Sequence, residues 1–487
     1  MKIFRPGERP SWVVSLIPFI VLIVALALVI KVFGTGALDG GSQVALMFGA
    51  AVVVAISLIF YKIPWRVFEK SILDNITAVG TSILILLLIG AVSGSWMISG
   101  VVPTMIFYGM KVILPEIFLF ATCIICALIA VMTGSSWTTI ATVGVALVGI
   151  GTAQGYEPGW IAGAIISGAY FGDKVSPLSD TTVLASSTAG TPLFTHIRFM
   201  MVTTVPSFLI TLVIFLIVSL IHEAPSAAQV ADISNDLKGA FNISPWLLLV
   251  PVVTALLIVK KVSAIVTLFI AAFIAGITAL FFQPHIIAAV ANGGMPDSTA
   301  GLSFLEGFKG LFISYYGSTA IETGNLALND LVATRGMTGM LGTVFLIFAA
   351  GSFGGTLVGS GMLLSLTEML TKFIRRRVTM VASTVGTGIF ANMVTGDQYL
   401  SIILTSSLYK DLYKKRGYEN KLLSRSVEDS ATVVSVLIPW NSCGMTQATG
   451  LKVATLEYLP YCFFNLLSPL MSIFIASIGY KIVRKSK

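Results

Sequence analysis

Charged side chains are scarce in this sequence. Of its 487 residues, 11% are Asp, Glu, Lys or Arg, whereas 56% are hydrophobic. An ordinary soluble protein carries about 25% charged residues, and a surface much poorer than that cannot be kept hydrated. The composition therefore excludes a soluble enzyme, a secreted factor and a disordered regulator. It predicts an all-α polytopic membrane protein, with the lipid bilayer as its solvent.

Cysteine is also scarce, with 4 residues in the chain. Cys123 and Cys126 form a C-x-x-C motif, but it lies in the apolar stretch 119–131, which is typical of a helix. We therefore expect this pair to pack between helices rather than to bind zinc or carry out redox chemistry, and we expect no disulfide framework. No Walker A motif is present either, so nothing in the sequence indicates ATP-driven transport or a cofactor.

The net charge of +8 is concentrated in short segments. These are Lys62, Arg66 and Lys70, then Arg375, Arg376 and Arg377, residues 410–425 and residues 481–487. This positive-inside pattern sets the orientation of a membrane protein and does not indicate a nucleic-acid partner. Because Lys2, Arg5 and Arg9 make the N-terminus basic as well, we predict that both termini are cytoplasmic and that the number of spans is even.

One acidic segment separates two parts of the chain. Residues 222–241 carry Glu223, Asp232 and Asp236 against Lys238. This composition is typical of the outer side of a membrane, where the bias toward Lys and Arg does not apply. We therefore predict two membrane halves, residues 1–240 and residues 241–487.

Apolar stretches recur along the chain at the length of a membrane span, which is about 20 residues. The clear examples are residues 12–33, 44–61, 76–95, 117–131, 200–221, 245–259, 264–282, 339–358, 378–394 and 458–482. The first is too long for the h-region of a signal peptide and lacks a small-residue cleavage site, so we interpret it as a retained helix. With interrupted segments included, we predict about 10–14 transmembrane helices.

Other apolar stretches are interrupted by Gly, Pro, Ser, Thr and Asp. They are residues 133–151, 159–190, 351–370, 392–408 and 432–450. Irregular backbone is tolerated at membrane depth only where it is buried in protein or lines a wet cavity. These stretches therefore predict broken helices and re-entrant segments along a transport path.

Two of these polar breaks recur at one spacing. The segment Met132-Thr133-Gly134-Ser135 resembles Val394-Thr395-Gly396-Asp397, which lies 262 positions later. The same offset carries Pro177-Leu-Ser-Asp-Thr181 onto Pro439-Trp-Asn-Ser-Cys443. An internal repeat is thus indicated. Corresponding interrupted segments in two halves are the best sequence pointer to the binding site of a secondary transporter.

The densest polar signal is the segment 168–182, where Pro177 interrupts a helix between Asp173 and Asp180. Ser176, Ser179, Thr181 and Thr182 add hydroxyl oxygens. Hard cations prefer several oxygens and a carboxylate, so we predict Asp173 and Asp180 as ion- and proton-binding residues. Asp180, Ser179 and Thr181 are the predicted sodium ligands. The alternative is a cytoplasmic loop in which Asp173 and Lys174 form a solvated pair.

The other breaks supply the remaining candidates. Asp397 lies between the apolar residues 389–394 and 399–404, and we predict it as a second-repeat ion- or proton-binding residue. The predicted supporting ligands are Thr133, Ser135, Ser179, Thr181, Thr395 and Asn441. The strip 133–139 could instead pack helices together through small residues. Lys174, Glu428 and Asp429 are candidates for coupling, although Glu428 and Asp429 could simply pair with Lys421 and Arg425 at the cytoplasmic rim.

Three strings resemble the NhaC-type sodium/proton antiporters of the ion transporter superfamily. They are Gly172-Asp-Lys-Val-Ser-Pro-Leu-Ser-Asp-Thr-Thr182, His196-Ile-Arg198, and Ser424-Arg-Ser-Val-Glu-Asp429 leading to Ile438-Pro-Trp-Asn-Ser-Cys-Gly444. The resemblance runs from the second helix to Gly444. It implies an electrochemically driven antiporter in the bacterial inner membrane, with two inverted repeats and an elevator-like homodimer. The family also has members that resemble malate/lactate exchangers coupled to sodium and protons.

The sequence departs from this family pattern at three places. It reads Val434-Ser-Val436 before Leu437, it has Ser442 where threonine is common, and it has Val183 where asparagine is frequent. Relative to that family, the last change removes one candidate ligand, and it leaves open which ion or organic partner is bound.

Three functions follow for testing. The first is a sodium/proton antiporter, in which the two cations compete for one carboxylate and exchange by alternating access. The second is a sodium- and proton-coupled exchanger of organic anions or amino acids, which needs a cation such as Lys174, Arg335 or Lys452, or a helix N-terminus, to bind a carboxylate group. The third is a channel, which ranks lowest because the acidic residues are clustered and do not form rings.

Overall fold

The computed structural model describes residues 9–33, 40–222, 227–260, 262–293, 302–319, 321, 329, 332–371, 374 and 376–482. Within these ranges the chain is almost entirely helical, and an isolated bridge joins Thr319 and Thr334. The predicted all-α membrane fold is thus confirmed. The predictions that concern Lys2, Arg5, Glu223, Arg375 and residues 483–487 lie outside the described residues.

The helices before residue 241 are α1 (Trp12–Phe33), α2 (Gly41–Phe60), α3 (Trp65–Ala78), α4 (Gly80–Ile98), α5 (Val101–Val112), η2 (Pro115–Ile117), α6 (Phe118–Thr133), α7 (Ser136–Thr139), η3 (Ile140–Gly144), α8 (Val145–Ala153), α9 (Pro158–Val175), α10 (Asp180–Ala189), α11 (Leu193–Ile221) and α12 (Ala227–Ala240). Those after it are η4 (Pro245–Leu248), α13 (Leu249–Val259), α14 (Ala264–Phe282), α15 (Pro284–Ala291), α16 (Phe304–Tyr316), η5 (Gly336–Met340), α18 (Leu341–Gly359), α19 (Met362–Thr371), α20 (Arg377–Thr395), α21 (Gln398–Lys415), α22 (Asn420–Val427), η6 (Glu428–Thr432), η7 (Ser435–Leu437), α23 (Ser442–Leu451), α24 (Thr455–Tyr458), η8 (Leu459–Tyr461) and α25 (Phe463–Ile478). The short segments η3 and η6 are π-helical, and the other η segments are 3₁₀-helical.

Among the described residues, 8 helices are long and apolar enough to cross a membrane, or 11 if each bent pair counts as one span. Three predicted spans belong to such pairs, which bend by 70°, 88° and 57°. The sequence analysis did not predict these bends. The first has a clear local cause, because Gly100 ends α4 in the left-handed conformation at φ 77°.

The predicted repeat is visible in the backbone. Gly134 ends α6 and Gly396 ends α20, both in the left-handed conformation, with φ of 67° and 64°. Gly155 and Gly417 form a second pair at the same offset, with φ of 78° and 76°. Tyr-Glu follows both Gly155 and Gly417, and the next residue begins α9 in the first case and α22 in the second. This second Gly-Tyr-Glu match lies at the same offset but was not among the sequence predictions.

Helix caps repeat at the same spacing. Ser135 caps α7 and Asp397 caps α21, each accepting a hydrogen bond from a backbone N–H three residues later. Ser179 caps α10 through Thr182 N–H, three residues later, and Asn441 caps α23 through Cys443 N–H, two residues later. In both repeat units, therefore, the helix that follows each break begins at a side-chain cap.

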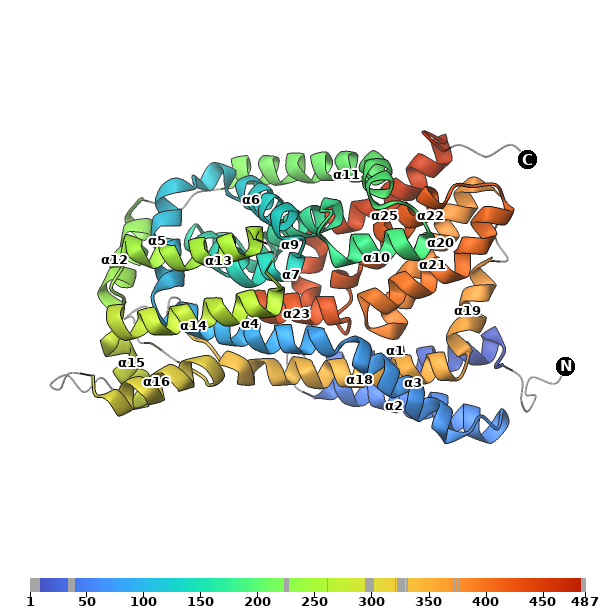
Figure 1. The fold of residues 1–487 in the computed structure, drawn as a ribbon, viewed down its shortest axis with the longest axis horizontal. Coiled ribbons are helices and arrows are strands. Elements are labelled where there is room, and N and C mark those ends of the chain that lie inside the picture. The colour runs from blue at the N-terminus through green and yellow to red at the C-terminus, as the bar shows by residue number, and fades with distance from the viewer. Residues whose placement is uncertain are drawn as a thin grey trace.

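The first repeat unit, α6 to α10, and the second, α20 to α23, enter the molecule from opposite ends (Figure 1). From the end where α12 lies, α6 reaches the middle of the molecule, and α8 returns to pack against α5. From the other end, where α1 begins and α25 ends, α20 reaches the middle, and α21 returns to pack against α22. This arrangement is the predicted inverted repeat, and the division at residue 240 remains a prediction.

Close backbone packing joins α6 to α9. A Cβ atom at Gly168 would lie 2.1 Å from the Cys123 carbonyl oxygen, and one at Gly172 would lie 2.3 Å from the Ala127 carbonyl oxygen. Such close approach through small residues is how membrane helices associate without a hydrophobic driving force. Cys123 and Cys126 are free and buried here, as expected for a pair that packs between helices.

Candidate functional site

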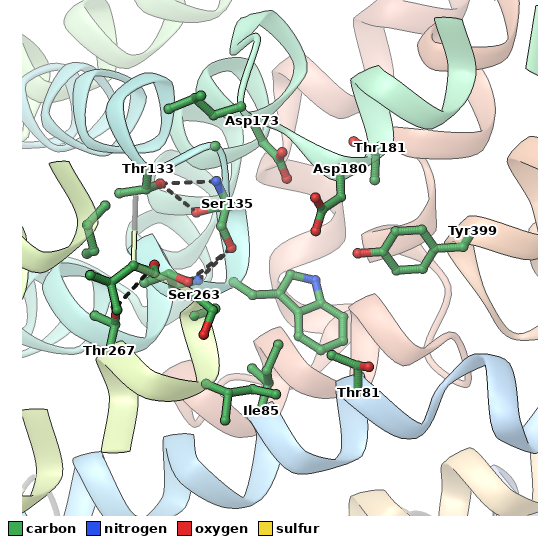
Figure 2. A pocket seen from close by; sticks show the side chains of 18 of the residues that line it. Thr81, Ile85, Thr133, Ser135, Asp173, Asp180, Thr181, Ser263, Thr267 and Tyr399 are labelled. Atoms are coloured by element: carbon green, nitrogen blue, oxygen red, sulfur yellow. Dashed lines mark hydrogen bonds between the residues drawn. The ribbon is translucent and has the colours of Figure 1, made fainter. Parts of the chain in front are cut away.

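A cavity of about 720 Å³ opens beside the two breaks of the first repeat unit. Its polar lining includes Thr133, Ser135, Asp173, Asp180, Thr181 and Tyr399. These residues come from the α6–α7 turn, the α9–α10 break and the start of α21, and Figure 2 shows them around one space. Segments far apart in the sequence therefore meet at the predicted position, and five of the predicted site residues line one cavity.

The α6–α7 turn is built by its own hydroxyl groups. Thr133 Oγ1 donates to the Ser135 carbonyl oxygen at 3.2 Å and accepts from Ser135 N–H at 3.1 Å. Thr395 makes the same two hydrogen bonds to Asp397, at 2.9 and 3.2 Å. Thr133 and Thr395 thus hold the two turns in shape, and the hydroxyl groups of the strip 133–139 do more than pack helices together.

Asp173 is held at the N-terminus of α7. Its Oδ2 accepts hydrogen bonds from Ser136 N–H at 3.1 Å and from Ser136 Oγ at 2.7 Å. The carboxylate is 6% exposed. Ser136 was not predicted as a site residue, and the one signal for it was its position next to the predicted ligand Ser135 in the strip 133–139. The alternative of a solvated pair between Asp173 and Lys174 is wrong, because both side chains are buried.

Asp180 is the exposed carboxylate of the cavity. It is the first residue of α10, and Figure 2 shows its side chain between Asp173 and Tyr399, whose hydroxyl points toward it. Ser179 is fully buried, where its hydroxyl caps α10 and pairs with Thr181 Oγ1 at 2.9 Å. Ser179 therefore holds the α9–α10 break in shape without lining the cavity, while Asp180 and Thr181 face the cavity.

Asp397, Thr395 and Asn441 gather at the second pair of breaks. Asp397 Oδ1 accepts from Leu400 N–H at 2.9 Å, and its Oδ2 accepts from Ser442 Oγ at 3.3 Å. Asn441 caps α23. Asp397 is 1% exposed and is not among the residues lining the cavity.

The acidic residue lies on a different break in each repeat unit. Asp180 corresponds to Ser442, and Asp397 corresponds to Ser135, at the offset of 262 residues. Each pair of breaks thus combines one serine and one aspartate, with the aspartate on the α9–α10 break in the first unit and on the α20–α21 turn in the second. The carboxylate faces the cavity in the first unit and is enclosed in the second.

Lys174 and Asp429 lie beside the cavity, fully buried. The Lys174 amine donates to Asp429 Oδ1 and forms an ion pair with it. Arg425 Nε lies 3.9 Å from Asp429 Oδ2, also fully buried, whereas Lys421 pairs with Glu419 near the surface. Asp429 therefore does pair with Arg425, but inside the protein and not at a solvated rim.

Comparison with known proteins shows which family the chain belongs to. A model of the Na+/H+ antiporter family matches residues 10–190 and 168–480. The chain is 37% identical to the Na+/H+ antiporter NhaC of Bacillus subtilis, with 88% of this chain and 91% of that one aligned. It is 36% identical to the NhaC of Alkalihalophilus pseudofirmus (86% and 87% aligned) and 34% identical to the malate-2H+/Na+-lactate antiporter of Bacillus subtilis (92% and 91% aligned). By its sequence, the chain belongs to the Na+/H+ antiporter family.

Proposed function

We propose that this protein exchanges sodium for protons across the bacterial inner membrane by alternating access, as a secondary transporter without a cofactor. The observation that carries the proposal is the Asp180 carboxylate, which is exposed to an internal cavity beside the buried Asp173. A carboxylate at membrane depth costs roughly 2.5–3.5 kcal/mol on insertion scales, so it is rarely without function. Membership of the family and the antiporter relatives support the same function.

The cavity has the chemistry of a sodium site. Asp180 supplies a carboxylate, and the hydroxyl groups of Thr133, Ser135 and Thr181 line the same space. Hard cations are held by several oxygen atoms, and broken helices add carbonyl oxygens to such a shell. We infer that Asp180 and Thr181 bind the ion, with Asp173 beside them. Ser179 is buried behind the break and would act by holding the loop.

Alternating access would come from the inverted repeat. Two units with the same local structure can exchange conformations, so that the site opens first to one side and then to the other. We propose that the two repeat units, each with its two breaks, move against the rest of the molecule within a homodimer. The cytoplasmic position of both termini belongs to the same proposal.

A second candidate is a sodium- and proton-coupled exchanger of organic anions or amino acids. The cavity favours it by size, because about 720 Å³ far exceeds the share of roughly 30 Å³ that one water molecule takes in the liquid. The malate-2H+/Na+-lactate relative points the same way. An anion would need a free cation, but Lys174 pairs with Asp429 and Lys452 donates to the Ala333 carbonyl oxygen. Among the described residues that line this cavity, none is Lys or Arg.

Flux through reconstituted liposomes distinguishes these functions. If sodium alone collapses an imposed pH gradient, the protein is a sodium/proton antiporter. If flux begins only when malate, lactate or an amino acid is added, the second function is correct. Asp180→Asn should abolish either flux, and Glu457→Gln, a change at an exposed residue of α24, is the matched control. Flux at normal rates in Asp180→Asn would contradict the site.

A further inference from the structure

A second hollow lies at the surface, apart from the cavity and from Lys174, Glu428 and Asp429, which are fully buried. It has a volume of about 740 Å³ and forms where the C-terminal end of α10 meets the junction of α21 and α22. Among the described residues, none lines both this hollow and the cavity. The proposed sodium/proton exchange therefore leaves the second hollow without a role.

The charged side chains that line this hollow are mainly basic. The basic ones are Lys410, Lys414, Lys415, Arg416 and Lys421, and the acidic ones are Asp411 and Glu419. Five positive charges therefore face two negative ones, and we call this surface the basic hollow. A concave surface with an excess of one sign of charge focuses its field and raises the local concentration of ions of the opposite sign. The ligand that fits is thus an anion.

Lys414 and Lys415 are two cations that a ligand can reach. Lys421 pairs with Glu419. Lys414 and Lys415 are exposed, and neither forms an ion pair with a described residue. Both lie at the C-terminal end of α21, where positive charge also stabilises a helix through its dipole. A basic helix end alone thus does not require a ligand.

Thr191 lines the basic hollow with a polar group that lacks a partner. Its side chain is 8% exposed, and its Oγ1 makes no hydrogen bond with a described residue. The backbone N–H of Thr191 is paired, because it donates to the Ser186 carbonyl oxygen at 2.8 Å. Leaving a buried hydroxyl group unpaired is costly. The Thr191 hydroxyl is therefore a donor for an acceptor oxygen that enters the hollow.

The walls of the basic hollow come from both repeat units and are joined by hydrogen bonds. Lys410 Nζ donates to the Thr188 carbonyl oxygen at 2.9 Å. Asn420 Nδ2 donates at 3.1 Å to the carbonyl oxygen of Gly190, which ends α10. A site whose walls are already fixed loses less conformational entropy when a ligand binds. The hollow also lies at the far end of the helix that begins at Asp180.

We propose that the basic hollow binds the phosphate group of an anionic ligand, with Lys414 and Lys415 neutralising its charge and Thr191 donating a hydrogen bond. A phosphate group fits this lining because it combines negative charge with several acceptor oxygens. An anionic phospholipid headgroup and a soluble phosphate compound both offer this chemistry. Basic pockets between helices on the cytoplasmic side bind lipid headgroups, and residues 410–425 are predicted to face the cytoplasm. Such a site is separate from sodium/proton exchange, because it lies outside the cavity.

Binding of pyrophosphate to the purified full-length protein tests the soluble source. Isothermal titration calorimetry compares the wild-type protein with Lys414→Gln/Lys415→Gln, which should bind roughly tenfold more weakly because two charges near the phosphate are lost. Thr191→Val keeps the net charge and should weaken binding several-fold, because it removes the donor. The matched control, Arg66→Gln/Lys70→Gln, removes the same charge from exposed residues of α3 and should bind as the wild-type protein does.

Native mass spectrometry of the same four proteins tests the lipid source. The wild-type protein should retain more phosphatidylglycerol than phosphatidylcholine. This preference should fall in Lys414→Gln/Lys415→Gln and in Thr191→Val, but not in the α3 variant. A lipid preference with this pattern, without pyrophosphate binding, assigns the site to a phospholipid. Pyrophosphate binding with the same pattern, without a lipid preference, assigns it to a soluble phosphate compound.

Three results would overturn the proposal. The first is a wild-type protein that neither binds pyrophosphate nor prefers phosphatidylglycerol. The second is binding at the wild-type level in Lys414→Gln/Lys415→Gln or an equal loss in the α3 variant. The third is unchanged binding in Thr191→Val, which would place the anion elsewhere on the basic surface. Because neither measurement involves transport, failure of the proposed sodium/proton exchange would be seen separately, in the flux assay.

Discussion

At the scale of single residues, exposure separates the three aspartates predicted from the sequence. Asp180 is open to the cavity, and the side chains of Asp173 and Asp397 are 6% and 1% exposed. Asp180 can therefore gain and lose a ligand without disturbing the fold, whereas Asp173 and Asp397 hold parts of the backbone through Ser136 and Leu400. The three are expected to respond differently to substitution.

The first prediction concerns Asp180→Asn. Sodium-dependent flux should be lost, because the amide cannot neutralise the ion, while stability should change by no more than about 0.5 kcal/mol, as for other exposed positions. Flux in liposomes and thermal unfolding in detergent are the two measurements, with Glu457→Gln as the control. A large fall in the midpoint of unfolding would show that Asp180 supports the fold instead.

The second prediction separates charge from capping at Asp397. Asp397→Asn should remain folded, because asparagine caps a helix about as well as aspartate, but it should lose sodium dependence. Asp397→Ala should in addition lose about 1 kcal/mol of stability with its cap. Sodium titrations of flux, together with unfolding of both variants, check this pair. Retained sodium affinity in Asp397→Asn would leave Asp397 a purely structural residue.

At the scale of elements, the sequence predicted the breaks better than it predicted the bends. Thr133-Gly134 and Thr395-Gly396 could be recognised because a left-handed glycine and a capping hydroxyl group are properties of a few adjacent residues. The bends between α4 and α5 and between α24 and α25 interrupt apolar sequence, and length alone does not reveal them. Side-chain partners were harder still, since the pairing of Lys174 with Asp429 joins residues 255 positions apart.

The third prediction concerns the α6–α7 turn. Gly134 has φ +67°, and a Cβ atom there would lie 2.6 Å from the backbone carbonyl carbon of Leu178 in the α9–α10 break. Gly134→Ala should cost at least the 1–2 kcal/mol or so of a left-handed alanine, and it should push the turn away from the break and reduce flux. Gly386→Ala in α20 is the matched control, because its Cβ atom would meet nothing within 4 Å. Equal stability and flux in the two variants would contradict the proposed contact between turn and break.

At the scale of the whole molecule, charge distinguishes the two ends. Lys410, Lys414, Lys415, Arg416 and Lys421 surround a surface hollow at the ends of α21 and α22. At the opposite end, α12 carries Asp232 and Asp236 (Figure 1). Lys and Arg are enriched on the cytoplasmic side of membrane proteins, so we expect the end that holds α22 and the start of α1 to face the cytoplasm. An inverted repeat between two such ends lets the same pair of breaks be reached from either side.

The fourth prediction tests this orientation. A cysteine introduced by Lys415→Cys should react with a membrane-impermeant maleimide only in inside-out vesicles, and one introduced by Asp232→Cys only in intact cells whose outer barrier has been removed. The native protein is a suitable background, because its four cysteines are free and buried and should remain unlabelled in both preparations. Labelling of the Lys415→Cys variant from outside would show that the orientation is the reverse of the predicted one. The inverted repeat would still stand in that case, since it depends on the geometry of the two units and not on which end faces the cytoplasm.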